Sequence, residues 1–509
     1  TSNLIMILSR DSLKKIAGIK SQHIPGKQVF ELPERVLQFG TGVLLRALPD
    51  YFIDKANKEN IFNGRIVIVK STGQGEIESY GLQDSLYTLS IKGIEDGQLI
   101  DDTIINASVS RVLSAQHDWK TVLACAQNPD LQVVISNVTE AALVNVDDSP
   151  SDEPPGSFPG KLLSFLLERY RRLGGSPESG LVIIPTELIP DNGLLLKSIL
   201  LDKCRKNNLD PDFVSWLQTA NDFCSSLVDC IVPGALPKDG QEALHSRFGY
   251  ADSLAIMSEV YRLWAIESQQ EKTKTILSFA KADPRVIVTT DISRFRELKL
   301  RLLNGAHTFT CGLAIWAGFT TVKQAMNDKK FSNFITALLH QELTLAVESE
   351  RISREEAIRF ADSVLDRFRN PFLEHRWQSI CLQYSTKMRS RNVANILNYY
   401  QKEKKAPRLM AAGFAGWLFY MKSEKKEEHQ FDGNLRGIEY RLQDEEAGKL
   451  NVYWSKADGN LNWLIESVLG DTTLWSEDLR QINGFKELVL ENLMLLMNGS
   501  PDAFFKLNT

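Results

Sequence analysis

A short β run that leads through a glycine turn into a helix constrains the fold of this chain most. Arg35-Val-Leu-Gln-Phe39 is followed by Gly40-Thr41-Gly42 and then by a stretch with helical spacing through Asp54. This order is typical of a dinucleotide-binding unit, in which backbone N–H groups of the turn and of the helix face a pyrophosphate. Leu45 stands where the third glycine of that fingerprint would be, so an ordinary βα turn explains the segment equally well.

Further β runs and a late helical half extend this pattern. The β runs cover 65–70, 131–136, 181–185 and 286–289, while 86–91 and 99–105 flank a turn-rich stretch and predict an inserted hairpin. We expect helices between Gly193 and Asp229 and again from Asp291 onward. Because 509 residues are too many for one core, two domains are expected. The sequence therefore predicts an α/β protein with a Rossmann-type N-terminal domain and mixed sheet, 1–288, and a mostly α-helical C-terminal domain, 289–509.

Polar residues at strand ends are the candidate nucleotide contacts. The run 65–70 ends on Lys70, where dinucleotide folds usually carry an acid that binds the ribose diol. Without that acid NAD and NADP stay undecided, because Lys70 suits a 2′-phosphate and equally suits a solvated strand end. Asn137-Val138-Thr139-Glu140 follows the run 131–136. We expect it to meet the cofactor ribose, since ligands of open α/β sheets lie at the carboxyl ends of strands.

Two further candidates follow the run 181–185. Glu187 and Asn192 lie just past its end, although a plain turn made by Pro190-Asp-Asn-Gly193 explains them as well.

Residues 147–160 contain four prolines and four acids and predict a surface loop, with a helix beginning near Leu162.

An otherwise apolar helical run, 299–308, carries the candidate chemistry. Lys299 offers an acid/base group, and Asn304 and His307 can hold a carbonyl oxygen beside it. On an ideal helix His307 lies about 80° and Asn304 about 140° from Lys299, but Lys299 and His307 would be about 12 Å apart along the axis. Either the helix begins inside this segment or a substrate lies along it. Taken alone, a lysine at a helix edge, a capping asparagine and a core histidine explain the residues too.

Composition and charge favour a small-molecule ligand. A formal net charge of −5 and a pI near 5.9 provide no basic field for nucleic acid. The six cysteines do not show the regular spacing of a disulfide framework, which indicates free thiols in a reducing compartment. No spacing typical of a metal site is present. No run of ~20 apolar residues, the length needed to span a membrane, occurs. We expect a soluble, cytoplasmic protein without metal, nucleic-acid or membrane partners. Basic clusters at 402–405 and 422–426 are interpreted as solvated surface, mixed with acids or in loops.

With these pieces in place, the chain resembles the mannitol dehydrogenase family, the polyol-specific long-chain dehydrogenases, from about residue 30 onward. The matching segments are Gln38 to Gly42 with Arg46, Asn137 to Glu140, Ser226 to Asp229, and the K-x4-N-x2-H pattern of Lys299, Asn304 and His307. The resemblance implies NAD(H) contacts at Phe39, Gly40, Thr41, Gly42, Arg46, Asn137, Thr139 and Glu140. Lys70 is a further candidate cofactor contact because of its position at the end of the run 65–70. It also implies that Lys299 exchanges a proton with an oxygen held by Asn304 and His307, and that Asp229 and Lys387 border the substrate.

Within the family the resemblance is to the branch that interconverts tagaturonate and altronate in hexuronate catabolism, through 187–193, 305–308, 367–371 and 386–391. Thr186-Glu187-Leu188 stands where the polyol enzymes carry Cys-Asp-Asn, so their assisting amide is absent, and Glu187 or Asn192 is hypothesised to replace it. A uronate carboxylate needs a cation. Arg389 and Arg391 lie beside Lys387, and we expect Arg389 to bind the carboxylate, with a solvated surface position as the alternative.

Other functions stay open at this point. A fructuronate reductase or a polyol dehydrogenase would use the same fold, a dinucleotide-sensing binding protein would keep only the nucleotide half, and a G-x-G turn also serves adenosyl cofactors in methyl transfer. NADP is not excluded as the cofactor. The family's habit implies a monomer or a small homo-oligomer.

Overall fold

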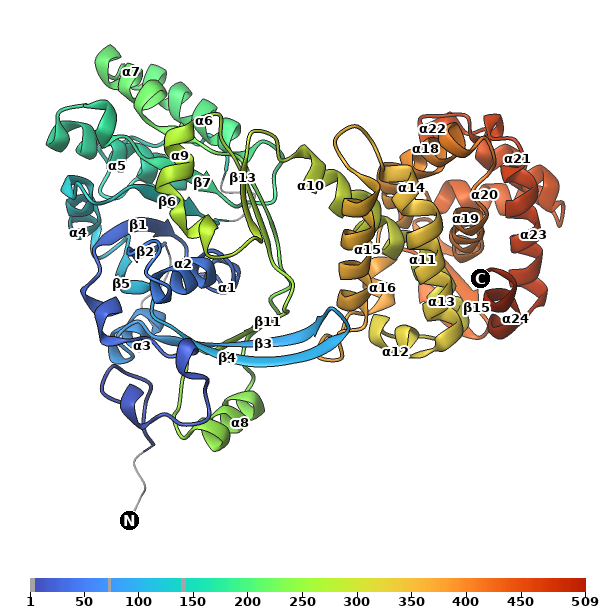
Figure 1. Cartoon of the computed structure of the whole chain (residues 1–509). Coiled ribbons are helices and arrows are strands. Elements are labelled where there is room, and N and C mark those ends of the chain that lie inside the picture. The colour runs from blue at the N-terminus through green and yellow to red at the C-terminus, as the bar shows by residue number, and fades with distance from the viewer. Residues whose placement is uncertain (1–4, 72–74, 139–142) are drawn as a thin grey trace. The chain divides into compact units, whose positions relative to one another are not determined.

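A six-stranded parallel sheet organises the first half of the chain (Figure 1). Its order is β5-β2-β1-β6-β7-β8, and all five pairs of neighbouring strands are parallel. The strands are β1 (Glu34–Phe39), β2 (Arg65–Lys70), β5 (Val109–Ser114), β6 (Val133–Ser136), β7 (Val182–Pro185) and β8 (Asp222–Phe223). The chain order reverses between β1 and β6, which makes the carboxyl ends of these two strands the expected ligand crevice of a doubly wound sheet.

Helices cover both faces of this sheet because successive strand residues point to opposite sides. Along β1, Val36 packs into one apolar cluster, and Leu37 and Phe39 pack into the other. The first cluster is completed by α1 (Val43–Ala47), α2 (Pro49–Lys58) and α3 (Gly75–Leu82). The second is completed by α4 (Trp119–Ala124), α5 (Phe158–Leu173), α6 (Asn192–Lys206) and α7 (Pro211–Ala220).

Two smaller sheets complete the first half. The predicted hairpin is present as β3 (Tyr87–Glu95) and β4 (Gln98–Asn106), and it joins β10 (Gly234–Ala235) and β11 (Ile256–Ser258). The segment 226–229, predicted to be helical, is instead β9 (Ser226–Asp229), which lies antiparallel to β12 (Leu263–Glu267). The other neighbour of β12 is β13 (Val286–Thr289), and α8 (Lys238–Phe248) and α9 (Glu271–Ile276) are the remaining α-helices of this half. The alternating pattern of β9 is too short to predict a strand against the helical spacing around it, because the sequence does not show which strand pairs with it.

The computed structural model describes residues 5–71, 75–138 and 143–509, and the chain divides into two compact units. The first comprises residues 1–92 and 99–292, and the second comprises 93–98 and 293–509. The second unit is mainly helical, as the sequence predicts. Its α-helices are α10 (Ser293–Leu298), α11 (Gly305–Ala317), α12 (Val322–Asn327), α13 (Lys329–Ala337), α14 (Thr344–Val347), α15 (Arg354–Phe368), α16 (Trp377–Ile380), α17 (Tyr384–Lys387), α18 (Val393–Glu403), α19 (Arg408–Tyr420), α20 (Ala447–Ala457), α21 (Leu461–Leu469), α22 (Thr472–Trp475), α23 (Phe485–Asn498) and α24 (Pro501–Leu507).

The core of the second unit is built on close contact between α11 and α19. A Cβ on Gly312 would lie 2.8 Å from the carbonyl oxygen of Gly416, so only glycine lets the two backbones approach this far. A three-stranded sheet, β14 (Ser423–Glu427), β15 (Gln430–Leu435) and β16 (Ile438–Arg441), also belongs to this unit. The basic segment 422–426, predicted as loop, therefore lies largely on a strand, although its side chains are mostly exposed as expected.

Three π turns interrupt the helices of the second unit: η8 (Lys299–Asn304), η9 (Leu338–Leu343) and η10 (Met388–Asn392). In η8 the N–H of Gly305 donates to the carbonyl of Leu300, five residues earlier, and not to Arg301, four residues earlier. The side-chain amide of Asn395 donates to that Arg301 carbonyl at 3.1 Å. Arg301 in turn donates through its guanidinium to the carbonyls of Ser390 (3.0 Å) and Arg391 (2.8 Å), so η8 and η10 hold each other in place.

Removing the Asn395 amide should destabilise the second unit. Asn395 is fully buried, and Asn395→Ala leaves the Arg301 carbonyl without its side-chain donor, at a cost of about 1–3 kcal/mol. Chemical denaturation of the full chain measures this loss. Asn498→Ala is the control, because Asn498 makes a similar 3.1 Å bond to the carbonyl of Met494 at an exposed position. Equal denaturation midpoints for the two variants would contradict the role given to Asn395.

Candidate active site

A pocket of about 520 Å³ lies at the carboxyl ends of β1, β2 and β6. Five residues predicted to bind a nucleotide line it together: Gly40, Thr41, Gly42, Lys70 and Asn137. The rest of the lining comes from the residue after β2, from the segment between β6 and α5, and from the start of α5, namely Ser71, Val138, Val144, Val146, Gly156, Ser157, Phe158 and Lys161. The structure thus brings three strand ends, distant in sequence, to one cavity.

The two glycines of the turn have different physical roles. Gly40 has a φ of +128°, and a Cβ there would lie 3.1 Å from the carbonyl oxygen of Asn137. Gly42 has an ordinary φ of −58°, and a Cβ there would meet nothing within 4 Å. Gly40 is therefore required by the backbone, whereas Gly42 keeps space open beside the first turn of α1. That space and the N–H groups of the turn fit a diphosphate.

Phe39 and Arg46 support the turn from behind and are not among the residues that line the pocket. Phe39 is fully buried and packs edge-on against Phe158, with ring centroids 5.1 Å apart. The buried guanidinium of Arg46 donates to the carbonyls of Thr41 (3.1 Å) and Leu254 (2.8 Å). The structure gives both residues a supporting position, and their direct contact with a cofactor stays a prediction. Thr139 and Glu140, also predicted to contact the cofactor, lie outside the described residues.

Lys161 is a pocket residue that the sequence did not single out. It lies in the first turn of α5, is only 7% exposed, and donates to the carbonyl of Gly156 at 3.1 Å. Burial lowers the pKa of its ammonium group, partly offset by the charge of Asp148. The loop 147–157 lies between β6 and Lys161 in the sequence. No motif of fixed spacing therefore predicts that Lys161 lies in the pocket at the end of β6.

Glu187 and Asn192 take up structural hydrogen bonds in the first unit. Glu187 is 2% exposed and accepts from the Ser136 hydroxyl (2.8 Å) and the Val138 N–H (3.1 Å), while burial raises the pKa of its carboxyl group. The Asn192 amide donates to the carbonyls of Glu187 (2.9 Å) and Ser226 (3.1 Å) and accepts from the Ser226 N–H (2.9 Å). Both donor hydrogens of Asn192 are engaged with the backbone, so the substrate-assisting role hypothesised for it finds no support here. Asp229 is buried at the end of β9.

Lys299, Asn304 and His307 lie on one continuous helical segment formed by α10, η8 and α11. The helix begins at Ser293, before the segment and not inside it. Lys299 and Asn304 are the first and last residues of η8. A π turn has about 4.4 residues, whereas an α-helix has 3.6, so the five-residue spacing of Lys299 and Asn304 leaves them about 50° apart around the axis. The π turn therefore removes much of the angular separation that an ideal α-helix predicts for this pair.

His307 is buried, at 9% exposure, among aromatic rings. It stacks on Phe368 with ring centroids 4.2 Å apart and meets His375 edge-on at 5.1 Å. Its Nε2 is buried and has no hydrogen-bond partner within the described part of the chain. Burial, then the charges of His375, Arg367, Arg391 and Lys387, lower the pKa of His307 well below 6.5. A neutral imidazole with an unpaired nitrogen is suited to hydrogen-bond a ligand oxygen.

Cations on and beside η10 surround this histidine. Arg391 donates to the hydroxyl of Thr308, next to His307 in the chain, at 3.1 Å. Lys387, half-buried, donates to the carbonyl of Ile380 at 2.9 Å, and burial followed by the charge of Arg391 lowers its pKa. Arg389, the residue expected to bind a carboxylate, has a 3.5 Å contact with the carbonyl of Leu474. Arg391, and not Arg389, therefore lies next to the candidate catalytic helix.

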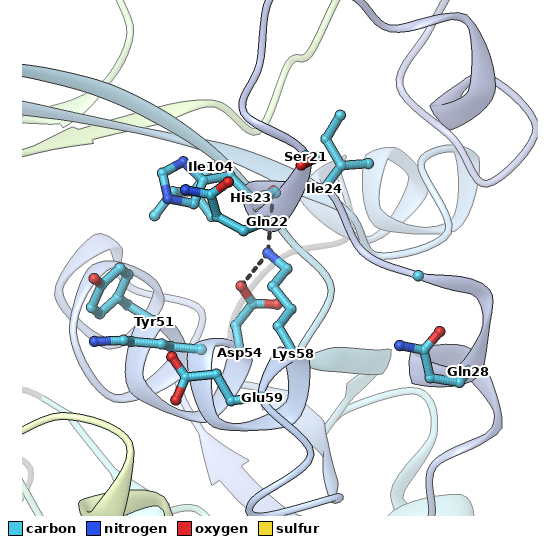
Figure 2. A pocket seen from close by; sticks show the side chains of 12 residues that line it. Ser21, Gln22, His23, Ile24, Gln28, Tyr51, Asp54, Lys58, Glu59 and Ile104 are labelled. Carbon is cyan, nitrogen blue, oxygen red and sulfur yellow. Dashed lines mark hydrogen bonds and ion pairs between the residues drawn. The ribbon is translucent and has the colours of Figure 1, made fainter.

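A second pocket, of about 450 Å³, lies between the N-terminal arm and α2 (Figure 2). Both lysines that line it are already paired with acids: Lys58 donates to Asp54 at 2.6 Å, and Lys55 forms a 3.1 Å ion pair with Asp283. Figure 2 shows the Lys58 side chain directed at Asp54. This pairing leaves neither lysine as a ready partner for an anionic ligand.

The described ranges 5–71, 75–138 and 143–509 contain neither a group of metal ligands nor a helix that could span a membrane. No group of three or more His, Cys, Asp or Glu side chains there is placed to hold a metal ion. No helix there combines the length and the apolar character needed to cross a bilayer.

The pH dependence of stability tests the neutral state of His307. Its folded pKa is lowered below 6.5, the value of an exposed imidazole. As pH falls below 6.5 the unfolded chain takes up a proton that the folded chain does not, so stability drops by at most about 1.4 kcal/mol per pH unit until the folded pKa is reached. His307→Asn removes this contribution. Denaturation between about pH 7 and pH 5 should therefore show a smaller loss in the variant than in the wild type.

His117→Asn is the matched substitution, because His117 is exposed on the surface. It should keep the wild-type loss of stability. Equal losses for the wild type and His307→Asn would show that His307 is not held neutral by burial.

Two family models together match most of the chain. Residues 34–278 match the mannitol dehydrogenase Rossmann domain, and residues 291–496 match the mannitol dehydrogenase C-terminal domain. Among solved structures, D-sorbitol dehydrogenase in substrate-free form superposes with a TM-score of 0.75 at 19% identity, covering 98% of this chain and 100% of that one. Pseudomonas fluorescens mannitol 2-dehydrogenase, in a ternary complex with NAD and D-mannitol, superposes with a TM-score of 0.62 at 19% identity, covering 98% and 99%.

Curated relatives extend the match at higher identity. The altronate oxidoreductase of Halalkalibacterium halodurans is 36% identical over 474 residues, covering 92% of this chain and 91% of that protein. The altronate oxidoreductase of Bacillus subtilis is 34% identical over 455 residues, covering 89% and 90%. Both units, in the same order, are thus shared with dehydrogenases, and the resemblance inferred from the motifs is confirmed: the chain belongs to the mannitol dehydrogenase family.

Proposed function

We propose that this protein is an NAD-dependent oxidoreductase that reduces the keto-acid tagaturonate to altronate with NADH and catalyses the reverse oxidation. The observation that carries the proposal is the K-x4-N-x2-H set on a π turn, with a neutral, unpaired His307 nitrogen beside it, in a chain whose curated relatives are altronate oxidoreductases. The substrate is a small sugar acid, and metal takes no part in the scheme below.

The nucleotide is held by the pocket at the ends of β1, β2 and β6. The open space at Gly42 and the N–H groups of the turn receive the diphosphate, and Asn137 lies where a ribose is expected. When bound, NADH supplies the hydride that adds to the carbonyl carbon. Lys70 occupies the position of the usual ribose-binding acid, so NADPH is the competing cofactor that the assay must include.

The proton comes from the second unit. Lys299, as an ammonium, gives a proton to the carbonyl oxygen as negative charge develops there, and in the reverse direction its amine removes the hydroxyl proton. Asn304 and the Nε2–H of His307 donate hydrogen bonds to the same oxygen. Because His307 is neutral, it donates a hydrogen bond without supplying the proton, which leaves Lys299 as the acid.

Four alternative functions differ from this proposal in substrate, in turnover or in the residues they need. A fructuronate reductase or a polyol dehydrogenase would use the same three residues on another substrate. A dinucleotide-sensing protein would bind NADH without turnover. Methyl transfer has no use for the Lys299, Asn304 and His307 set.

Substitution of Lys299 separates enzyme from sensor. Lys299→Ala should lower kcat for tagaturonate reduction by ~10²-fold or more, because it removes the acid/base group, while NADH affinity stays at the wild-type value. Steady-state rates and NADH fluorescence titration measure the two quantities. Lys329→Ala, at an exposed position on α13, is the control and should behave as wild type. Full turnover by Lys299→Ala would rule out the proposed acid.

A further inference from the structure

We propose that Arg391 and Lys387 bind the carboxylate of the substrate, so that η10 sets the preference for an acidic over a neutral sugar. This inference rests on the proposed function and deepens it. Arg391 lies within η10, and Lys387 is the residue immediately before it.

The hydrogen-bonding capacity of the two cations is largely unused. Among the described residues, the Arg391 side chain donates one hydrogen bond, to Thr308, and the Lys387 side chain donates one, to the Ile380 carbonyl. Arginine has five N–H donors and lysine has three. By comparison, the buried guanidinium of Arg169 donates to four backbone carbonyls, those of Ser179, Ala126, Asn128 and Leu131. Arg391 and Lys387 therefore retain several donors in a site that is partly shielded from water.

The positive charge of this pair is only weakly compensated, because Asp444, whose charge acts on Lys387, forms no ion pair with it. Neither residue forms an ion pair with an acid among the described residues, whereas the buried Lys203 and the half-buried Arg285 are paired with Asp148 and Asp283. Two cations that are partly buried and repel each other are costly to hold together, and an anionic ligand relieves that cost. A planar carboxylate matches the fork of a guanidinium.

The location of the pair suits a substrate that reacts at His307. The Arg391 guanidinium bonds the Thr308 side chain at 3.1 Å, one residue from His307. The ring of His375 adjoins His307 at 5.1 Å, and the charges of both Arg391 and Lys387 reach the His307 imidazole. One end of an open-chain keto-acid can thus be held by the cations while its carbonyl oxygen meets His307 Nε2.

The contacts of the neighbouring arginine argue against it as the receptor. Arg389 is only two residues away on the same turn, but its guanidinium contacts the Leu474 carbonyl, near α22. Substitutions of Arg391 and Arg389 therefore compare two arginines of the same turn, one beside Thr308 and the other beside Leu474.

The kinetic experiment compares Arg391→Gln, Arg391→Lys and Arg389→Gln in the full-length protein with NADH. The substrates are tagaturonate and its methyl ester, which keeps the shape and removes the charge. Arg391→Gln should lower kcat/KM for tagaturonate about 10- to 100-fold, mainly through KM, as expected for loss of a charge-assisted hydrogen bond. The ester should change less than about 3-fold, Arg391→Lys should recover part of the loss, and Arg389→Gln should leave both substrates unchanged. Equal losses for acid and ester, or a larger loss in Arg389→Gln, would overturn the assignment.

A binding measurement without cofactor separates this inference from the proposed function. Calorimetry of the wild type with altronate, the corresponding neutral hexitol and inorganic phosphate should show that altronate binds at least about 10-fold more tightly than either, and Arg391→Gln should abolish the difference. Phosphate binding as tight as altronate, lost in the same variant, would mean a general anion site and would contradict a carboxylate receptor. A wild type that prefers altronate in this measurement but does not oxidise NADH with tagaturonate would refute the proposed function alone.

Discussion

The hydrogen bond from the Asn395 amide to the Arg301 carbonyl is the contact on which the candidate catalytic geometry depends. It supplies a partner to a carbonyl that does not receive the N–H of Gly305, because that N–H donates one residue further back, to Leu300. The π turn η8 is thereby stabilised, and with it the alignment of Lys299 and Asn304. The reciprocal bonds from Arg301 to the carbonyls of Ser390 and Arg391 fix η10 at the same time. Catalytic residues and candidate carboxylate ligands are thus held by one set of backbone contacts.

Electrostatics give these two turns different tasks. His307 is buried among aromatic rings and close to several cations, so its pKa is lowered and it stays neutral. A neutral histidine can polarise a carbonyl oxygen without competing with Lys299 as proton donor. Burial lowers the pKa of His307 most, and Arg391 and Lys387, the groups that we propose to bind the substrate carboxylate, lower it further. A neutral polyol would leave them uncompensated, which accounts for the preference for an acidic sugar in this proposal.

Local patterns predicted the strand, turn and helix order of the first unit and the helices of the second, because burial periodicity and glycine turns act over a few residues. They failed where partners are distant. The strand β9 is defined by its pairing with β12, and the role of Arg46 by its bond to the carbonyl of Leu254. Helical-wheel geometry misplaced Lys299 relative to Asn304, since a π turn depends on Asn395, some ninety residues further on. For the same reason spacing alone could not separate Arg391 from Arg389, because the group that each faces is set by tertiary packing.

The measurement that tests the account most directly follows the absorbance of NADH and, separately, of NADPH while the purified protein is offered tagaturonate, fructuronate and fructose. Rapid oxidation of NADH with tagaturonate, and little or none with the other two substrates or with NADPH, is the predicted result. Preferred turnover of fructuronate or fructose would contradict the substrate, and preferred use of NADPH would assign Lys70 to a 2′-phosphate. Binding of NADH without turnover of any substrate would contradict the enzyme itself.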